Sequence, residues 1–119
     1  LSIEFLGYVK NPLDQLRNAD VMINPVDEGS GVQTKIIETL GAGTTVVSAR
    51  SGARGIDQEL APEKLLLIED GDWAGFAKKV CDLHASGKTN LPTPVSFFSE
   101  YAERTITDRI VSSLTSDGR

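Results

Sequence analysis

The sequence is poor in the residue types that form disulfides, metal sites and nucleic-acid surfaces. It contains one cysteine, Cys81, so an intrachain disulfide is excluded and no cysteine spacing typical of a metal site exists. Its one histidine, His84, has no second catalytic partner with which a Ser-His-Asp or Cys-His arrangement could be built. The formal net charge of −5 argues against nucleic-acid binding, which needs clustered Lys and Arg. We therefore expect neither a metal nor a nucleic-acid partner.

Long hydrophobic runs are also missing. No apolar run approaches the roughly 18 residues that a membrane-spanning helix needs, and nothing resembles a signal peptide. A cytoplasmic location is therefore the default expectation, and a peripheral position at the inner face of a membrane is the alternative for the whole protein. Hydrophobic residues make up 39% of the chain and charged residues 24%, which suits one soluble globular domain. Because the chain starts without Met, directly on the strand-like LSIEFLGYV, we expect it to be part of a longer protein.

Short apolar segments alternate with helical patterns along the chain. Strands are predicted at residues 3–9, 21–24, 44–48 and 65–68. Helices are predicted from Asn11-Pro12, over Gln33 to Leu40, from Trp73 to Leu83, and over Ser96 to Leu114. In the third helix, a stripe including Trp73, Phe76, Val80 and Leu83 should be buried and Cys81 half-buried. This order predicts an α/β fold with a parallel sheet of about four strands and helices on both faces.

Parallel sheets of this kind bind ligands beyond the carboxyl ends of their strands. Three loops should meet at that edge: Asn24 to Gly31, Ser48 to Gly55, and Glu69 to Asp72. The second loop carries Arg50 and Arg54, which could meet an anion or be ordinary surface charges.

The segment from Pro25 to Ser48 is the most informative part of the chain. A Gly29-Ser30-Gly31 turn joins a strand to a helix, and such a turn presents unpaired backbone N–H groups and a positive helix end to phosphate. The alternative is that the turn is only a tight connection, with Ser30 as the helix N-cap, but its position at the carboxyl end of a strand favours the phosphate site. Lys35 and Glu38 share one helical face, so they could form a surface ion pair. Alternatively, Glu38 could accept hydrogen bonds from paired sugar hydroxyls, with Lys35 close to phosphate.

Several of these segments together resemble a known family. They are LGYVKNPLDQLRNADVMINP (residues 6–25), GSGVQTKIIETLGAGTTVVS (29–48), GARG (52–55), LLLIED (65–70) and, more loosely, FFSEYAERT (97–105). Their order is similar to that of the C-terminal, donor-binding half-domain of GT-B fold glycosyltransferases. These are retaining enzymes that transfer a sugar from a nucleotide-sugar to an acceptor. The resemblance implies a Rossmann-like domain spanning residues 1–119.

The resemblance also implies roles for individual residues. The position of Glu38 binds the ribose hydroxyls of the nucleotide, and the turn at Gly29, Ser30 and Gly31 faces the diphosphate and donor sugar. Lys35 is the cation left near the diphosphate. Many members carry a second glutamate eight positions before the ribose-binding one, where this chain has Ser30.

The resemblance covers only part of an enzyme. The resemblance implies that the N-terminal acceptor domain is not part of these 119 residues, so we assign no catalytic residue here and expect that this chain alone does not transfer sugar. The expected partners are a nucleotide-sugar donor and a sugar, lipid or protein acceptor, without a cofactor or metal, and the C-terminal helix could pack between molecules. Two alternatives remain open: a non-catalytic α/β binding or interaction module, and a sugar epimerase of the GT-B fold.

Overall fold

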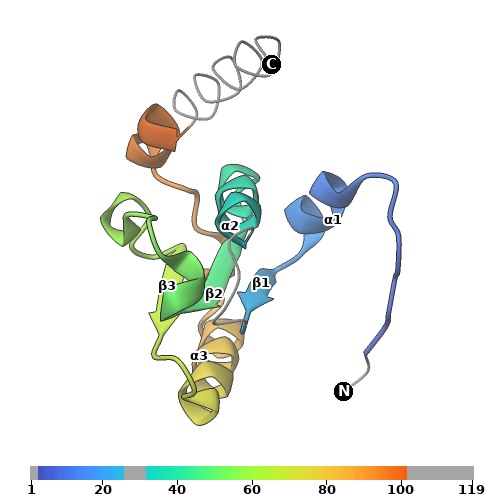
Figure 1. The fold of residues 1–119 in the computed structure, drawn as a ribbon, viewed down its shortest axis with the longest axis vertical. Coiled ribbons are helices and arrows are strands. Elements are labelled where there is room, and N and C mark those ends of the chain that lie inside the picture. Colours follow the sequence, from blue (N-terminus) through green and yellow to red (C-terminus); the bar gives the residue numbers. More distant parts are fainter. Residues whose placement is uncertain (1–2, 26–31, 102–119) are drawn as a thin grey trace, which may run out of the picture.

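A computed structural model describes residues 3–25 and 32–101 (Figure 1). In chain order, the helices and strands are α1 (Pro12–Asn18), β1 (Val21–Asn24), α2 (Val32–Gly41), β2 (Thr45–Ala49), β3 (Leu65–Ile68) and α3 (Trp73–Ser86). Short 3-10 turns are η1 (Arg50–Ala53), η2 (Gln58–Leu60) and η3 (Lys88–Asn90). The chain is helical again over residues 95–101.

The three strands form one parallel sheet in the order β1-β2-β3. Val21 pairs with Thr45 and Val46 pairs with Leu65, so the strands follow one another across the sheet as they do in the sequence. The strands lie within one residue of the segments predicted at 21–24, 44–48 and 65–68. The predicted α/β class with a Rossmann-like parallel sheet is confirmed.

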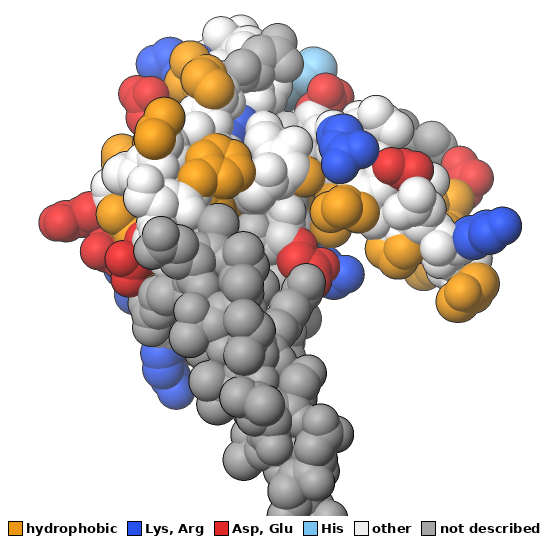
Figure 2. Space-filling view, turned by 90° about the horizontal axis from the view of Figure 1, so that it is seen from above, with side chains coloured by type: hydrophobic (Ala, Val, Ile, Leu, Met, Phe, Trp, Pro, Cys, Tyr) orange, Lys and Arg blue, Asp and Glu red, His pale blue; other side chains and the backbone are white. Residues whose placement is uncertain are grey.

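The strand predicted over residues 3–9 is wrong. These residues form no regular secondary structure and pair with none of the described strands, so the described sheet has three strands rather than about four. Ile3 and Phe5 are 78% and 95% exposed, in a segment that leads into α1 along the outside of the molecule (Figure 1). Hydrophobic side chains are accordingly visible at the surface in Figure 2. An apolar run becomes a strand only where a neighbouring strand takes its backbone hydrogen bonds, and none of the strands in residues 3–25 and 32–101 does so for residues 3–9.

The hydrophobic core has two parts, one on each face of the sheet. Ile36 and Leu40 of α2 pack with Val46 and Leu65 on one face. Phe76 and Leu83 of α3 pack with Val47 on the other. Successive strand residues point to opposite faces, which explains why the neighbours Val46 and Val47 belong to different clusters. Every residue of β2 is buried, as expected of a central parallel strand covered by helices on both sides (Figure 1).

The predicted stripe on α3 is only partly buried. Phe76 and Leu83 are buried and Val80 packs against them, but Trp73 is 60% exposed. Trp73 is the first residue of the helix, and helix side chains point back towards the N-terminus, so its ring does not join the cluster that Phe76 and Leu83 form with the sheet. Cys81 is exposed rather than half-buried, because about 100° per residue turns it away from the face that carries Phe76 and Leu83.

The helix over residues 95–101 packs against the α2 side of the sheet. Phe97 and Tyr101 are buried in the same cluster as Ile36 and Leu40. The Tyr101 hydroxyl accepts a hydrogen bond of 2.7 Å from the backbone N–H of Asp57. The rest of the helix predicted to reach Leu114 lies outside the described residues, as does any packing of that helix between molecules.

Candidate functional site

The carboxyl edge of the sheet is held together by polar side chains. Asn24, the last residue of β1, donates a 3.0 Å hydrogen bond from its side-chain amide to the hydroxyl of Ser48 in β2. Both side chains are buried, and the two residues are paired across the strands. The bond therefore fixes the points from which two of the three predicted site loops leave the sheet.

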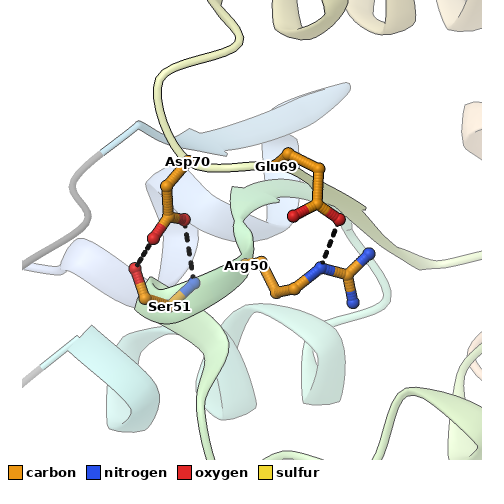
Figure 3. A network of polar contacts seen from close by, with 4 residues as sticks. All are labelled: Arg50, Ser51, Glu69 and Asp70. Atoms are coloured by element: carbon orange, nitrogen blue, oxygen red, sulfur yellow. Dashed lines mark hydrogen bonds and ion pairs between the residues drawn. The ribbon is translucent and has the colours of Figure 1, made fainter.

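A second set of contacts joins the ends of β2 and β3 (Figure 3). The Nε of Arg50 donates to Oε1 of Glu69 at 2.7 Å. The backbone N–H of Ser51 donates to Oδ1 of Asp70 at 3.1 Å, and the Ser51 hydroxyl donates to Oδ2 of the same carboxylate. The prediction that the loops after these two strands meet at one edge is confirmed. The third loop is described only as far as Pro25.

The pKa of Asp70 is lowered from its ordinary value of 3.8. The main causes are the hydrogen bonds from the hydroxyl and the backbone N–H of Ser51, which favour the charged carboxylate, and the cations Arg54 and Arg50 add to them. Asp70 is therefore ionised at neutral pH and acts as a hydrogen-bond acceptor.

Lys35 and Glu38 lie together on α2, as their spacing predicts. The Lys35 ammonium is 3.8 Å from Oε2 of Glu38, and the side chains are 49% and 42% exposed. An exposed pair at this distance is worth only a few tenths of a kcal/mol. Lys35 and Glu38 therefore form the predicted surface ion pair, and the Glu38 carboxylate stays accessible to a ligand. The other candidates, Gly29, Ser30 and Gly31, lie outside the described residues.

A pocket of about 510 Å³ opens beside the Arg50–Glu69 contact. Its charged lining is Arg50, Arg54, Glu69 and Asp70, and its apolar lining includes Ile56 and Leu67. The sequence identified the two arginines as possible ligands of an anion, but it identified Glu69 and Asp70 only as parts of a loop. Their position directly after β3 was the signal that could have identified them.

Two other kinds of feature are not found in the described parts of the chain. No group of three or more His, Cys, Asp or Glu side chains in residues 3–25 and 32–101 is placed to hold a metal ion. In the same residues, none of the helices has the length and apolar character needed to cross a membrane.

The comparisons with known proteins give one match. No curated protein and no solved structure is significantly similar to this chain. The sequence pattern of a family described as glycosyl transferases group 1 matches residues 1–86. The match ends with the last residue of α3 and includes all three strands, the Pro25 to Ser48 segment and both loops of the Arg50–Glu69 contact. Since it covers well over half of the 119 residues, the chain belongs to the glycosyl transferases group 1 family.

Proposed function

We propose that this chain is the donor-binding half-domain of a retaining glycosyltransferase and that it binds the nucleotide part of a nucleotide-sugar. The family match over residues 1–86 carries the proposal, because it includes the whole segment in which Gly29 to Gly31, Lys35 and Glu38 lie. In this proposal, Glu38 binds the ribose hydroxyls and the Gly29–Gly31 turn binds the diphosphate.

The position of Glu38 suits a ribose. An ionised carboxylate only accepts hydrogen bonds, and its two oxygens can take both hydroxyls of a vicinal pair. Hydrogen bonds to a charged group contribute about 1.5–3 kcal/mol, more than the exposed ion pair with Lys35 at 3.8 Å can contribute. A ribose can therefore compete for Glu38, and Lys35 then becomes available to the neighbouring diphosphate.

The transfer reaction needs more than this chain supplies. Catalysis of sugar transfer depends on stabilising the leaving diphosphate with positive charge, and Lys35 is one cation on an exposed helix face. We propose that a second domain provides the acceptor site and further cations, that no metal takes part, and that the enzyme works in the cytoplasm. The acceptor class stays open among sugars, lipids and proteins.

The test is binding of UDP, GDP and ADP, measured by titration calorimetry on the wild type and on Glu38→Gln. This change keeps the shape of the side chain but replaces one acceptor oxygen with a donor. We expect it to weaken binding by about 1–3 kcal/mol, roughly 5- to 150-fold, without changing the melting temperature. Glu59→Gln is the matched control, because Glu59 is an exposed glutamate on η2 and not on α2.

Equal affinity in the wild type and Glu38→Gln would leave Glu38 as a surface partner of Lys35 and favour a non-catalytic binding module. Absence of binding by all three nucleotides would contradict the proposal as a whole.

A further inference from the structure

A second pocket, of about 310 Å³, lies between α3 and the segment that leads into β3. Its floor is apolar and is formed by Leu66 of β3, Leu83 of α3 and Leu91, which follows η3. Leu66 and Leu83 belong to the cluster on the α3 face of the sheet. The pocket shares no lining residue with the one beside the Arg50–Glu69 contact, so it is a separate site.

Hydrogen bonds hold the walls of this pocket together. Lys64 is buried in the segment before β3, and its Nζ donates to the carbonyl of Thr89 in η3 at 3.1 Å. The Ser86 hydroxyl donates to the carbonyl of Leu83 at 3.1 Å and accepts from the backbone N–H of Lys88 at 3.3 Å. The three segments that line the pocket are therefore positioned before any ligand binds, which lowers the cost of binding.

The rim of the pocket carries charges of both signs. Glu63, Lys79 and Lys88 line it, and none of the three side chains forms an ion pair with any residue in the described ranges 3–25 and 32–101. Asp82 also lines the pocket, but its carboxylate is bound by the Lys78 ammonium at 3.0 Å. Two cations and one carboxylate thus remain for a ligand.

These charges fit a zwitterion better than a simple ion. A lone carboxylate would be attracted by Lys79 and Lys88 but repelled by Glu63, and a lone ammonium would be attracted by Glu63 and repelled by both lysines. The pocket also runs along the last turn of α3, and the negative end of a helix dipole favours an ammonium there. A ligand with both charges satisfies all of these groups.

The floor and the size of the pocket restrict the rest of the ligand. Leu66, Leu83 and Leu91 offer an apolar surface that an aliphatic chain can cover. Ligand pockets range from roughly 300 to 1,000 Å³, so one of about 310 Å³ suits a small molecule.

We propose that this pocket binds a free aliphatic α-amino acid. Lys79 and Lys88 bind its carboxylate, Glu63 binds its ammonium, and its side chain packs on the three leucines. This site goes beyond the proposed nucleotide function, because its lining comes from α3, η3 and the segments beside β3, whereas Glu38 lies on α2.

The test is NMR titration of the protein, following the backbone amide signals of Glu63, Leu83 and Lys88. The probe is L-leucine, and each of three analogues lacks one of its parts. Leucinamide lacks the carboxylate, 4-methylpentanoate lacks the ammonium, and glycine lacks the aliphatic chain. We expect saturable shifts with leucine and an affinity at least about ten-fold lower for each analogue, the scale of one lost charged hydrogen bond or one exposed side chain.

Variants and matched controls locate the binding. The double variant Lys79→Met with Lys88→Met should weaken leucine binding at least about ten-fold, and so should Glu63→Gln. Lys10→Met and Glu59→Gln are the controls, because both residues are exposed and neither lines the pocket, and they should bind leucine as the wild type does. Unchanged spectra outside the pocket would show that each variant retains the fold, and the analogues test the same charges without any substitution.

Three results would overturn the inference. They are the absence of a saturable shift with leucine, an analogue that binds as tightly as leucine, and equal leucine affinity in the wild type and the charge variants. None of these titrations involves a nucleotide or Glu38, so they stand whether or not the proposed nucleotide site is confirmed.

Discussion

The side-chain amide of Asn24 donates a 3.0 Å hydrogen bond to the Ser48 hydroxyl across the last pair of residues shared by β1 and β2. The Ser48 hydroxyl in turn donates to the backbone carbonyl of Ala49 at 2.8 Å. Both side chains are buried, so water cannot replace either partner. This short chain of bonds fixes the edge from which the loops after β1 and β2 extend.

Ser48→Ala should destabilise the fold by about 1–3 kcal/mol, since it leaves the buried amide of Asn24 without its acceptor. Urea denaturation would measure the change, with the exposed Ser99→Ala as the matched control. In the double variant with Asn24→Ala, the loss should be smaller than the sum of the two single losses, because the two side chains interact directly. Additive losses would show that the bond does not contribute.

Ser51→Ala should raise the pKa of Asp70, because the Ser51 hydroxyl is the main cause of its lowering. A carboxylate with a lowered pKa in the folded protein adds stability at pH values above its unfolded pKa. That contribution is lost as the pH falls through the folded pKa. Carbon-13 NMR titration of the Asp70 carboxyl in the wild type and the variant would measure the shift. An unchanged midpoint would contradict the role of the hydroxyl.

Lys64→Met should change how stability depends on pH. Lys64 is fully buried, its Nζ donates to the carbonyl of Thr89 at 3.1 Å, and burial lowers its pKa from 10.5. Between the lowered pKa and 10.5, the unfolded chain binds more protons than the folded one, so stability rises with pH. The variant should lack this rise. Urea denaturation at several pH values up to about 10 would show a wild-type advantage that grows with pH.

Phe76→Ala should cost about 3–5 kcal/mol, because the ring is only 8% exposed and packs between α3 and the sheet. Trp73→Ala, on the same helix, should change the stability by less than about 0.5 kcal/mol, because Trp73 is 60% exposed. Thermal or urea unfolding of the two variants would separate them. Similar losses in both would mean that the Trp73 ring is buried against the protein.

The sequence predicted the parts of this fold that local pattern determines. The strands β1, β2 and β3 were recognisable because each is a short apolar run followed by a loop, and α2 because its apolar residues repeat at helical spacing. Residues 3–9 show the same apolar pattern and still form no strand. Whether an apolar run pairs depends on a neighbouring strand, which local pattern does not reveal.

The position of the candidate site could be predicted from the sequence, but the contacts between its residues could not. The rule that ligands bind at the carboxyl ends of parallel strands placed Arg50 and Arg54 at the correct edge. It could not show that Glu69 would bind Nε of Arg50, or that Asp70 would bind Ser51, because these contacts join residues 19 positions apart. The burial of Trp73 was predicted wrongly for a related reason: helical spacing gives the face of a helix but not how much of that face the rest of the protein covers.

Substitutions at Asp72 and Gly75, at the start of α3, should not have additive effects on stability. Asp72 is the N-cap, and its Oδ1 accepts a 2.9 Å hydrogen bond from the backbone N–H of Gly75. A Cβ added at Gly75 would lie only 2.8 Å from Cγ of Asp72 and closer still to Oδ2, so the capping carboxylate would have to move. Asp72→Ala alone should cost about 0.5–2 kcal/mol through loss of the cap.

Gly75→Ala should therefore stabilise the protein in one background and not in the other. In the Asp72→Ala background, it should add about 0.5–1 kcal/mol, the usual gain of Ala over Gly in a helix. In the wild type, the displaced cap should offset that gain or reverse it. Urea denaturation of the four proteins would give an interaction free energy of at least about 0.5 kcal/mol. An equal gain in both backgrounds would show that the Asp72 side chain moves aside without losing its bond.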